Sequence, residues 1–216
     1  MNDYAAHTNG LPKTDFVWMK VMTHDIVSRR FSHLSLRNIL NGDGAVVGEN
    51  VLKACVRLEE IMASMNYNAF GDPEPGTEST RWMEDMVTAL SIVYLFRAKL
   101  RGLDMQMTNV TLLYPQMETA REDMKALLSS LVDLAESKDR EYGASWCKRG
   151  GIGAWFTTVR KFDRLITQVR QKGNNIWNVS EPVNSTESLE ETIKDGINYL
   201  LLILEKRKVI SEIERA

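Results

Sequence analysis

The sequence predicts an all-α helical bundle, and two observations carry this prediction. At least five segments repeat their apolar residues with the period of 3.6 that marks one buried face of a helix, and no segment shows convincing strand-like alternation. Glycine- or proline-containing breaks separate the periodic segments. With 216 residues, the chain is long enough for one good core or two small helical units. We therefore expect one helical body built from two segments.

In the first segment, a helix is predicted over residues 49–65, where one face is apolar. Residues 66–76 contain two prolines and two glycines and predict a loop. A second helix follows from about Trp82, and Gly102 is expected to end it. Residues 103–115 lack clear periodicity and are expected to form a connector or one short strand.

In the second segment, a helix is predicted over residues 117–137 and a glycine-rich break over 142–153, which is more simply a flexible connector than a phosphate-binding loop. Helical periodicity resumes at 155–169 and is expected to stop at Gly173. The last helix is expected to run to about Lys208. Its candidate caps are Ser185, Thr186 and Ser188, and Ser188-x-x-Glu191 has the spacing of a capping box.

The predicted domain organisation is an N-terminal helical region of unknown role (1–115) and a second helical domain (116–216). The two regions share a weak pattern, which includes Asp85 in the first and Asp195 in the second. Two explanations remain open: related halves, or the general similarity of helical hairpins.

Charge and composition exclude several classes of protein. The net charge is −2 and the pI about 6.0, so we expect no direct nucleic-acid binding and no anionic-membrane surface. The longest aliphatic run, 200–204, is too short to span a membrane. With only Cys55 and Cys147 and no visible secretion signal, we expect no disulfide framework and a cytoplasmic location.

The last helix carries an acidic face. On a helical wheel, the side chains of Glu187, Glu191, Asp195 and Asn198 fall within about 80° of one another, away from the main apolar face. Carboxylates four residues apart repel, and Mg²⁺ or Mn²⁺ bound by their oxygens would relieve the repulsion. A solvated acidic face and a metal site are equally good interpretations of this geometry. Leu202 and Val209 continue the same face, which suggests that it also contacts protein.

Two sets of motifs resemble a known family. Glu136-x-x-Asp139 on one helix and the acids of the last helix resemble the paired acidic motifs of the MazG-like and dimeric-dUTPase-like pyrophosphohydrolases. Four blocks within residues 125–208 are similar, in the same order, to the nucleotide-modification-associated domain of phage and bacterial proteins, a relative of that class. The blocks are EYGASW (141–146), GGIGAW (150–155), RKFDRL (160–165) and ESLEETIKDGINY (187–199).

The resemblance implies a helical bundle of MazG-like type that hydrolyses a (deoxy)nucleoside triphosphate to the monophosphate and pyrophosphate, using Mg²⁺ or Mn²⁺. Glu191 and Asp195 would be the catalytic residues. The metal ligands would be Glu136, Asp139, Glu187, Glu191 and Asp195. The sequence departs from the pattern because Glu191 stands four residues before Asp195, where relatives have three, and Thr192 fills the usual place.

Five further residues are candidates for substrate binding. Lys161 and Arg164 would hold phosphates, although such side chains also lie along helix surfaces without a ligand. Tyr142 and Trp146 would stack on a base or, alternatively, close the end of the bundle, and Asn198 would contact a base or sugar. The alternative function is a noncatalytic nucleotide-binding or adaptor protein linked to phage or bacterial nucleotide modification. The expected partners are a nucleotide and further copies of this chain in a homo-oligomer.

Overall fold

The computed structural model describes residues 13–31, 39, 43–71, 77–102, 117–143, 145–179 and 187–215. These residues form six α-helices and one short 3-10 helix, with no strand among them. The elements are α1 (Phe16–Arg30), α3 (Gly44–Ser64), α4 (Glu78–Gly102), α5 (Met117–Tyr142), η2 (Ser145–Cys147), α6 (Gly150–Gln171) and α7 (Leu189–Glu214). The prediction of an all-α bundle is confirmed, whereas the connector expected at 103–115 lies outside the described residues.

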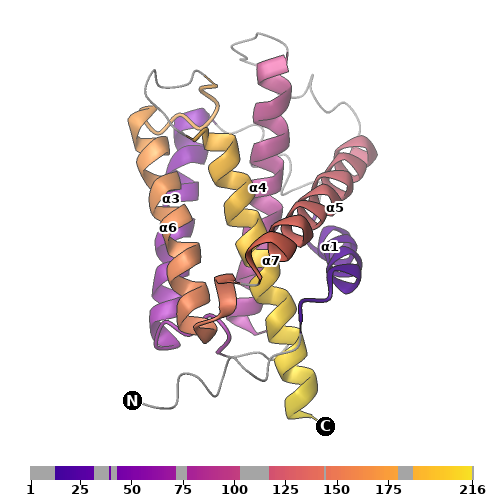
Figure 1. The fold of residues 1–216 in the computed structure, drawn as a ribbon. Helices are drawn as coiled ribbons and strands as arrows, with labels where there is room; N and C mark the ends of the chain where they lie inside the picture. Colours follow the sequence, from indigo (N-terminus) through magenta and orange to yellow (C-terminus); the bar gives the residue numbers. More distant parts are fainter. Residues whose placement is uncertain are drawn as a thin grey trace.

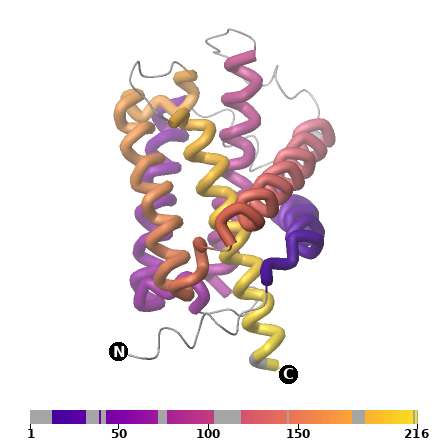
Figure 2. The backbone as a smooth tube through the Cα atoms, viewed as in Figure 1, coloured from indigo at the N-terminus to yellow at the C-terminus, as the bar shows by residue number. Residues whose placement is uncertain are grey.

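Helix α7 lies in the middle of the bundle (Figure 1). It packs along α4 and α6 and also contacts α1 and α5. Helix α3 lies beside α6, and α1 and α5 form a second pair that crosses the bundle obliquely on the other side of α7 (Figure 2). None of the described helices is both long and apolar enough to cross a membrane.

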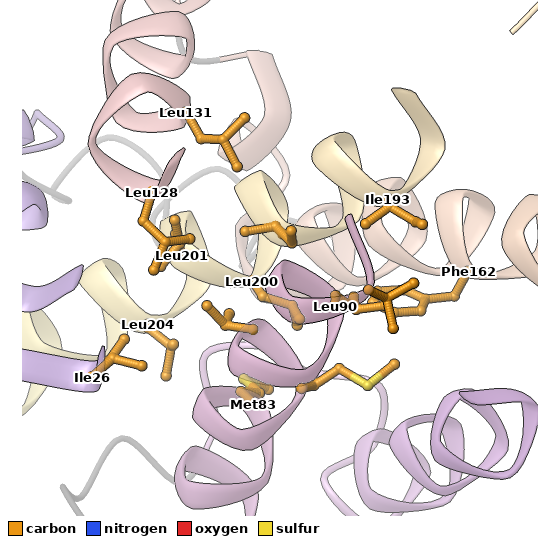
Figure 3. Packing of buried hydrophobic residues seen from close by; sticks show 14 of the residues in the cluster. Ile26, Met83, Leu90, Leu128, Leu131, Phe162, Ile193, Leu200, Leu201 and Leu204 are labelled. Carbon is orange, nitrogen blue, oxygen red and sulfur yellow. The ribbon is translucent and has the colours of Figure 1, made fainter. Parts of the chain in front are cut away.

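Both segments of the chain contribute to one hydrophobic core. Figure 3 shows Ile26 of α1 near Leu204 of α7, and Leu90 of α4 among side chains of α6 and α7. The apolar face predicted for the last helix is confirmed, because its five residues are at most 5% exposed. These residues are Leu189, Ile193, Ile197, Leu200 and Leu204. Leu202 is also buried, at 7% exposure, within the same chain.

Side-chain caps begin α1, α3 and α7. The capping box predicted at the start of α7 is present: Ser188 Oγ accepts from the Glu191 backbone N–H at 3.1 Å, and Glu191 Oε2 accepts from the Ser188 backbone N–H at 2.8 Å. Asp15 and Asp43 accept backbone N–H groups in the first turns of α1 and α3. These bonds satisfy donors that the helix itself leaves unpaired.

Helices α5 and α6 enter the region predicted as a glycine-rich break. Helix α5 continues to Tyr142, and α6 begins at Gly150, so the glycines at 150–153 form its first turn instead of a flexible connector. A close approach explains the glycine at 151, since a Cβ there would overlap Asn68 Oδ1. As predicted, α6 ends just before Gly173, whose φ of 64° favours glycine.

The turns after α3 and α6 have the same local structure. Each has two successive residues with positive φ: Asn66 and Tyr67 after α3 (53° and 57°), and Gly173 and Asn174 after α6 (64° and 62°). In each turn an asparagine side chain then accepts a backbone N–H from two residues ahead. Asn68 Oδ1 accepts from Phe70 at 3.1 Å, and Asn175 Oδ1 accepts from Trp177 at 3.0 Å.

Each of these turns also contacts the start of the helix in the other segment. The Ala69 N–H donates to Gly151 O at 3.1 Å, and the Ile176 N–H donates to Gly44 O at 3.0 Å. A Cβ on Gly44 would overlap Asn175 Oδ1, as one on Gly151 would overlap Asn68 Oδ1. The same contacts therefore recur with the two segments exchanged. They match α3 of the first segment to α6 of the second.

Two buried arginines, one on α4 and one on α7, each bind the turn of the other segment, so these contacts also recur with the segments exchanged. Arg97 of α4 is fully buried and donates to the carbonyls of Ile176 and Asn178 and, at 2.9 Å, to Glu190 Oε1 at the start of α7. Arg207 of α7 is 1% exposed. It donates to Ala69 O at 2.8 Å and to the Ser79 and Thr80 hydroxyls in the first turn of α4. The same contacts thus recur in the described parts of the two segments, the first half (α1, α3 and α4) and the second half (α5, α6 and α7).

Candidate functional site

A pocket of about 300 Å³ opens between α5, η2, α6 and α7 in the second half. Its lining combines charged, polar and aromatic side chains. The lining residues are Ala135, Lys138, Asp139, Tyr142, Ser145, Trp146, Lys161, Asp195, Asn198, Tyr199 and Leu202. A cavity of this size suits a small molecule.

Helix geometry explains how two elements supply most of the lining. On α5, residues 135, 138, 139 and 142 follow the i, i+3, i+4, i+7 spacing of one helix face. On α7, residues 195, 198, 199 and 202 follow the same spacing. Because these two faces lie opposite each other, residues about 60 positions apart in the sequence share one pocket.

The structure brings six of the predicted site residues to this pocket. They are Asp139, Tyr142, Trp146, Lys161, Asp195 and Asn198. Glu187 and Arg164 lie beside it and are connected to it through Lys161. Glu136 and Glu191 are not among its lining residues. The carboxylate of Glu191 is exposed and is held by Ser188 in the capping box, which lowers its pKa.

Cationic side chains hold the acids of the site. The ammonium of Lys161 lies 2.6 Å from Asp195 Oδ2 and 3.4 Å from Glu187 Oε1. Lys138 Nζ lies 3.3 Å from the other oxygen of Asp195, and Arg164 pairs with Glu187. These pairs connect the acidic end of α7 to both α5 and α6.

The two lysines determine the charge state of Asp195. Burial by itself raises the pKa of this carboxyl, but the hydrogen bonds and positive charges of Lys161 and Lys138 outweigh it, so the pKa lies below its usual value. Asp195 is therefore ionised at neutral pH. Burial raises the pKa of its neighbour Tyr199, and the negative charge of Asp195 adds to the effect, so Tyr199 is a neutral hydroxyl.

Three residues of the lining carry buried polar atoms with no hydrogen-bond partner among the described residues. These atoms are Asp139 Oδ1, Trp146 Nε1 and Asn198 Oδ1. Asn198 is only 6% exposed. Buried polar groups are nearly always hydrogen-bonded, so this group of atoms is typical of a site that a ligand or water completes.

Aromatic rings form the end of the pocket near η2. Trp146 is half-buried and packs edge-on against Phe70 of the first half, with ring centroids 6.1 Å apart. Tyr142 is 58% exposed at the rim. The sequence had left two roles open for these rings, and the contact of Trp146 with Phe70 agrees with the second, which is to close the end of the bundle.

The first half has a different arrangement at the corresponding place. Asp85 of α4 lies 3.7 Å from Arg30 of α1, as Asp195 of α7 pairs with Lys138 of α5. Counting from the matched glycines Gly44 and Gly151, the position of Lys161 is filled by Ala54. Burial accordingly raises the pKa of Asp85 even with Arg30 nearby. The arrangement of two ammonium groups on one carboxylate thus belongs to the second half.

The residues present do not fit a divalent cation in this arrangement. Among the described residues, no three Asp, Glu, His or Cys side chains lie close enough together to hold a metal ion. Glu187 and Asp195 contact ammonium or guanidinium groups instead, and Glu191 contacts its own helix start. Cys55 and Cys147 are free thiols, and Cys55 is buried.

Sequence reasoning did not single out three polar residues of the lining. Lys138, Ser145 and Tyr199 were not predicted to act. A helical wheel of α5 would have pointed to Lys138, because it shares a face with Asp139 and Tyr142.

No family model, curated protein or solved structure matches the chain.

Proposed function

We propose that the pocket between α5, α6 and α7 binds a small phosphate-bearing ligand of the nucleotide class, without catalysing its hydrolysis. The observation that carries the proposal is that Lys138 and Lys161 both form ion pairs with Asp195 in one pocket. Aromatic side chains and unpartnered polar atoms line the same pocket. Ammonium groups donate charge-assisted hydrogen bonds to phosphate oxygens. Each ammonium has three donors, so each can keep its carboxylate partner and also bind a phosphate.

Other residues of the lining suit the remainder of a nucleotide. Trp146, Tyr142 and Tyr199 offer ring faces to a base, and stacking tolerates any base because every base has a π face. Asn198 Oδ1 accepts and Trp146 Nε1 donates, so both match the polar edge of a base or the hydroxyls of a sugar. This combination favours a nucleotide over inorganic phosphate alone.

Metal-dependent hydrolysis of a (deoxy)nucleoside triphosphate is the second candidate. One observation favours it beyond the family resemblance: Asp139 and Asp195, from two different helices, line the same pocket. The ion pairs of Asp195 argue against it, because a cation would have to displace two ammonium groups. The binding function is therefore the better-supported proposal.

A homo-oligomer also remains a proposal. The reason for expecting one was the apolar continuation of the acidic face of α7. The described chain buries Leu202 itself, and α4 of the first half packs along α7. Sedimentation at high micromolar concentration distinguishes a monomer, in which the first half replaces a partner, from an oligomer.

Calorimetric titration with nucleoside mono- and triphosphates tests the proposed function. We expect saturable binding to the wild-type protein and a large loss of affinity in Lys161→Met. Lys53→Met is the matched control, because Lys53 is an exposed lysine whose partner is Glu49 on α3, away from the pocket. A parallel assay with Mg²⁺ should detect no pyrophosphate release. Absence of binding refutes the proposal, and metal-dependent release of pyrophosphate establishes the second candidate instead.

A further inference from the structure

We infer that the ammonium of Lys161 takes the place of a divalent cation in this site, so that ligand binding needs no metal ion. The inference rests on the proposed function, since it concerns the same pocket. Lys161 reaches from α6 to α7, and its Nζ lies between Asp195 Oδ2 at 2.6 Å and Glu187 Oε1 at 3.4 Å. A single positive centre thus bridges two carboxylates eight residues apart, Asp195 on α7 and Glu187 just before the N-cap of that helix, as a shared cation would.

The surrounding charges leave no electrostatic need for a metal ion. Lys138 adds a second ammonium to Asp195, and Arg164 adds a guanidinium to Glu187. Three cationic side chains therefore contact two carboxylates, and together with the carboxylate of Asp139, which also lines the pocket, these charges balance. A divalent cation placed among them would be repelled by the cations as well as attracted by the acids.

An independent observation indicates that the pocket receives a ligand. Asn198 lies one turn after Asp195 on α7, is 6% exposed, and lines the pocket with an Oδ1 that has no partner among the described residues. An unpartnered buried acceptor is rare in a native protein. A ligand that donates to Asn198 and places its phosphate on Lys161 and Lys138 would complete the site with protein side chains alone.

The first test compares two conditions with pyrophosphate as the probe. We expect the wild-type protein to bind pyrophosphate in EDTA, with saturation in calorimetry. Binding that appears only after Mg²⁺ is added would overturn the inference. If pyrophosphate fails to bind in both conditions, the proposed phosphate site is wrong, and the second test still decides the role of Lys161.

The second test titrates the protein with Mn²⁺ alone and follows free Mn²⁺ by electron paramagnetic resonance. The wild-type protein should bind Mn²⁺ only weakly. Lys161→Met should gain Mn²⁺ affinity by on the order of tenfold or more, because Glu187 and Asp195 lose the ammonium that separates them from a cation. Equal Mn²⁺ affinity in the two proteins overturns the inference.

Two controls keep the second test decisive. Lys53→Met removes an ammonium from an exposed pair on α3 and should bind Mn²⁺ as the wild type does. If Lys161→Met does not fold by circular dichroism, Lys161→Gln replaces it, since the amide keeps a donor near Asp195 without the positive charge. The expected gain in Mn²⁺ affinity is the same for both substitutions.

Discussion

Lys161 of α6 and Asp195 of α7 form an ion pair with 2.6 Å between Nζ and Oδ2, at the wall of the pocket. The pair connects two helices. The carboxylate of Asp195 also competes with a bound anion for the ammonium of Lys161. Both consequences can be measured separately.

Asp195→Asn should raise the affinity for pyrophosphate several-fold. The amide has nearly the shape of the carboxylate but removes its negative charge, so Lys161 and Lys138 lose the acid that competes with the ligand. Calorimetry measures the change. Asp163→Asn is the control, because Asp163 is an exposed acid on α6 that does not line the pocket. A fall in affinity would indicate instead that Asp195 helps to bind the ligand through a cation.

The stability difference between the wild type and Asp195→Asn should depend on pH. The pKa of Asp195 in the folded protein lies below its ordinary value of 3.8, so the folded state binds fewer protons than the unfolded state near that pH. The stabilisation is therefore complete above pH 3.8 and is lost as the pH falls through the lowered pKa. Urea unfolding should show the wild type to be more stable at pH 7 and the two proteins to converge in acid. A difference that does not change with pH would show that the ion pairs contribute nothing.

Arg97→Met should destabilise the protein by about 3 kcal/mol, because it removes one partner of a buried ion pair. The guanidinium of Arg97 is fully buried against Glu190 and two backbone carbonyls, which lose their donors in the variant. Urea unfolding measures the loss. Arg57→Met is the matched control, since Arg57 pairs with Glu60 and Glu78 on the surface, and its stability should stay at the wild-type level. Equal stability of the two variants would contradict the structural role of Arg97.

Gly44→Ala and Gly151→Ala should each cost about 1–3 kcal/mol, as is typical of overpacking. A Cβ at either position would overlap an asparagine side chain whose Oδ1 already accepts a backbone N–H. Gly102→Ala is the control, because a Cβ there meets nothing within 4 Å. In thermal unfolding, the Gly102→Ala control should have the melting temperature of the wild type, and the other two variants should melt at lower temperatures. A stable Gly151→Ala would show that Asn68 can move aside.

The two thiols should react at very different rates. Burial raises the pKa of Cys55 to about 12, and the side chain is only 4% exposed. Cys147 is half-buried at η2, and burial raises its pKa as well. With a thiol-specific reagent at pH 8, we expect Cys147 to react first and Cys55 only after unfolding, as mass spectrometry would show. Rapid modification of Cys55 in the native protein would contradict the packing of α3.

The sequence predicted α3 to α7 because apolar residues recur with helical spacing in each of these segments. It did not single out α1, in which Val17 and Val21 are 79% and 61% exposed and obscure the buried face. The ends of α5 and α6 were also missed. Glycines at 150–153 indicate a break when read alone, and the contact of Gly151 with Asn68 that explains them exists only in the folded protein.

For the site, the sequence predicted several of the residues that line the pocket, but not the ion pairs that these residues form. Asp195, Lys161 and Asn198 were all singled out, and the structure brings them to one pocket. The sequence could not show that Lys138 pairs with Asp195, 57 positions away, because such a contact depends on how α5 crosses α7.

The exchanged arginines have a consequence for the order in which the chain can fold. The turn after α3 receives a hydrogen bond from Arg207 of α7, and the turn after α6 receives one from Arg97 of α4. During synthesis, α1, α3 and α4 emerge from the ribosome long before α7, and until then the carbonyl of Ala69 lacks its arginine donor. The first half therefore cannot complete its contacts until the last helix has been synthesised.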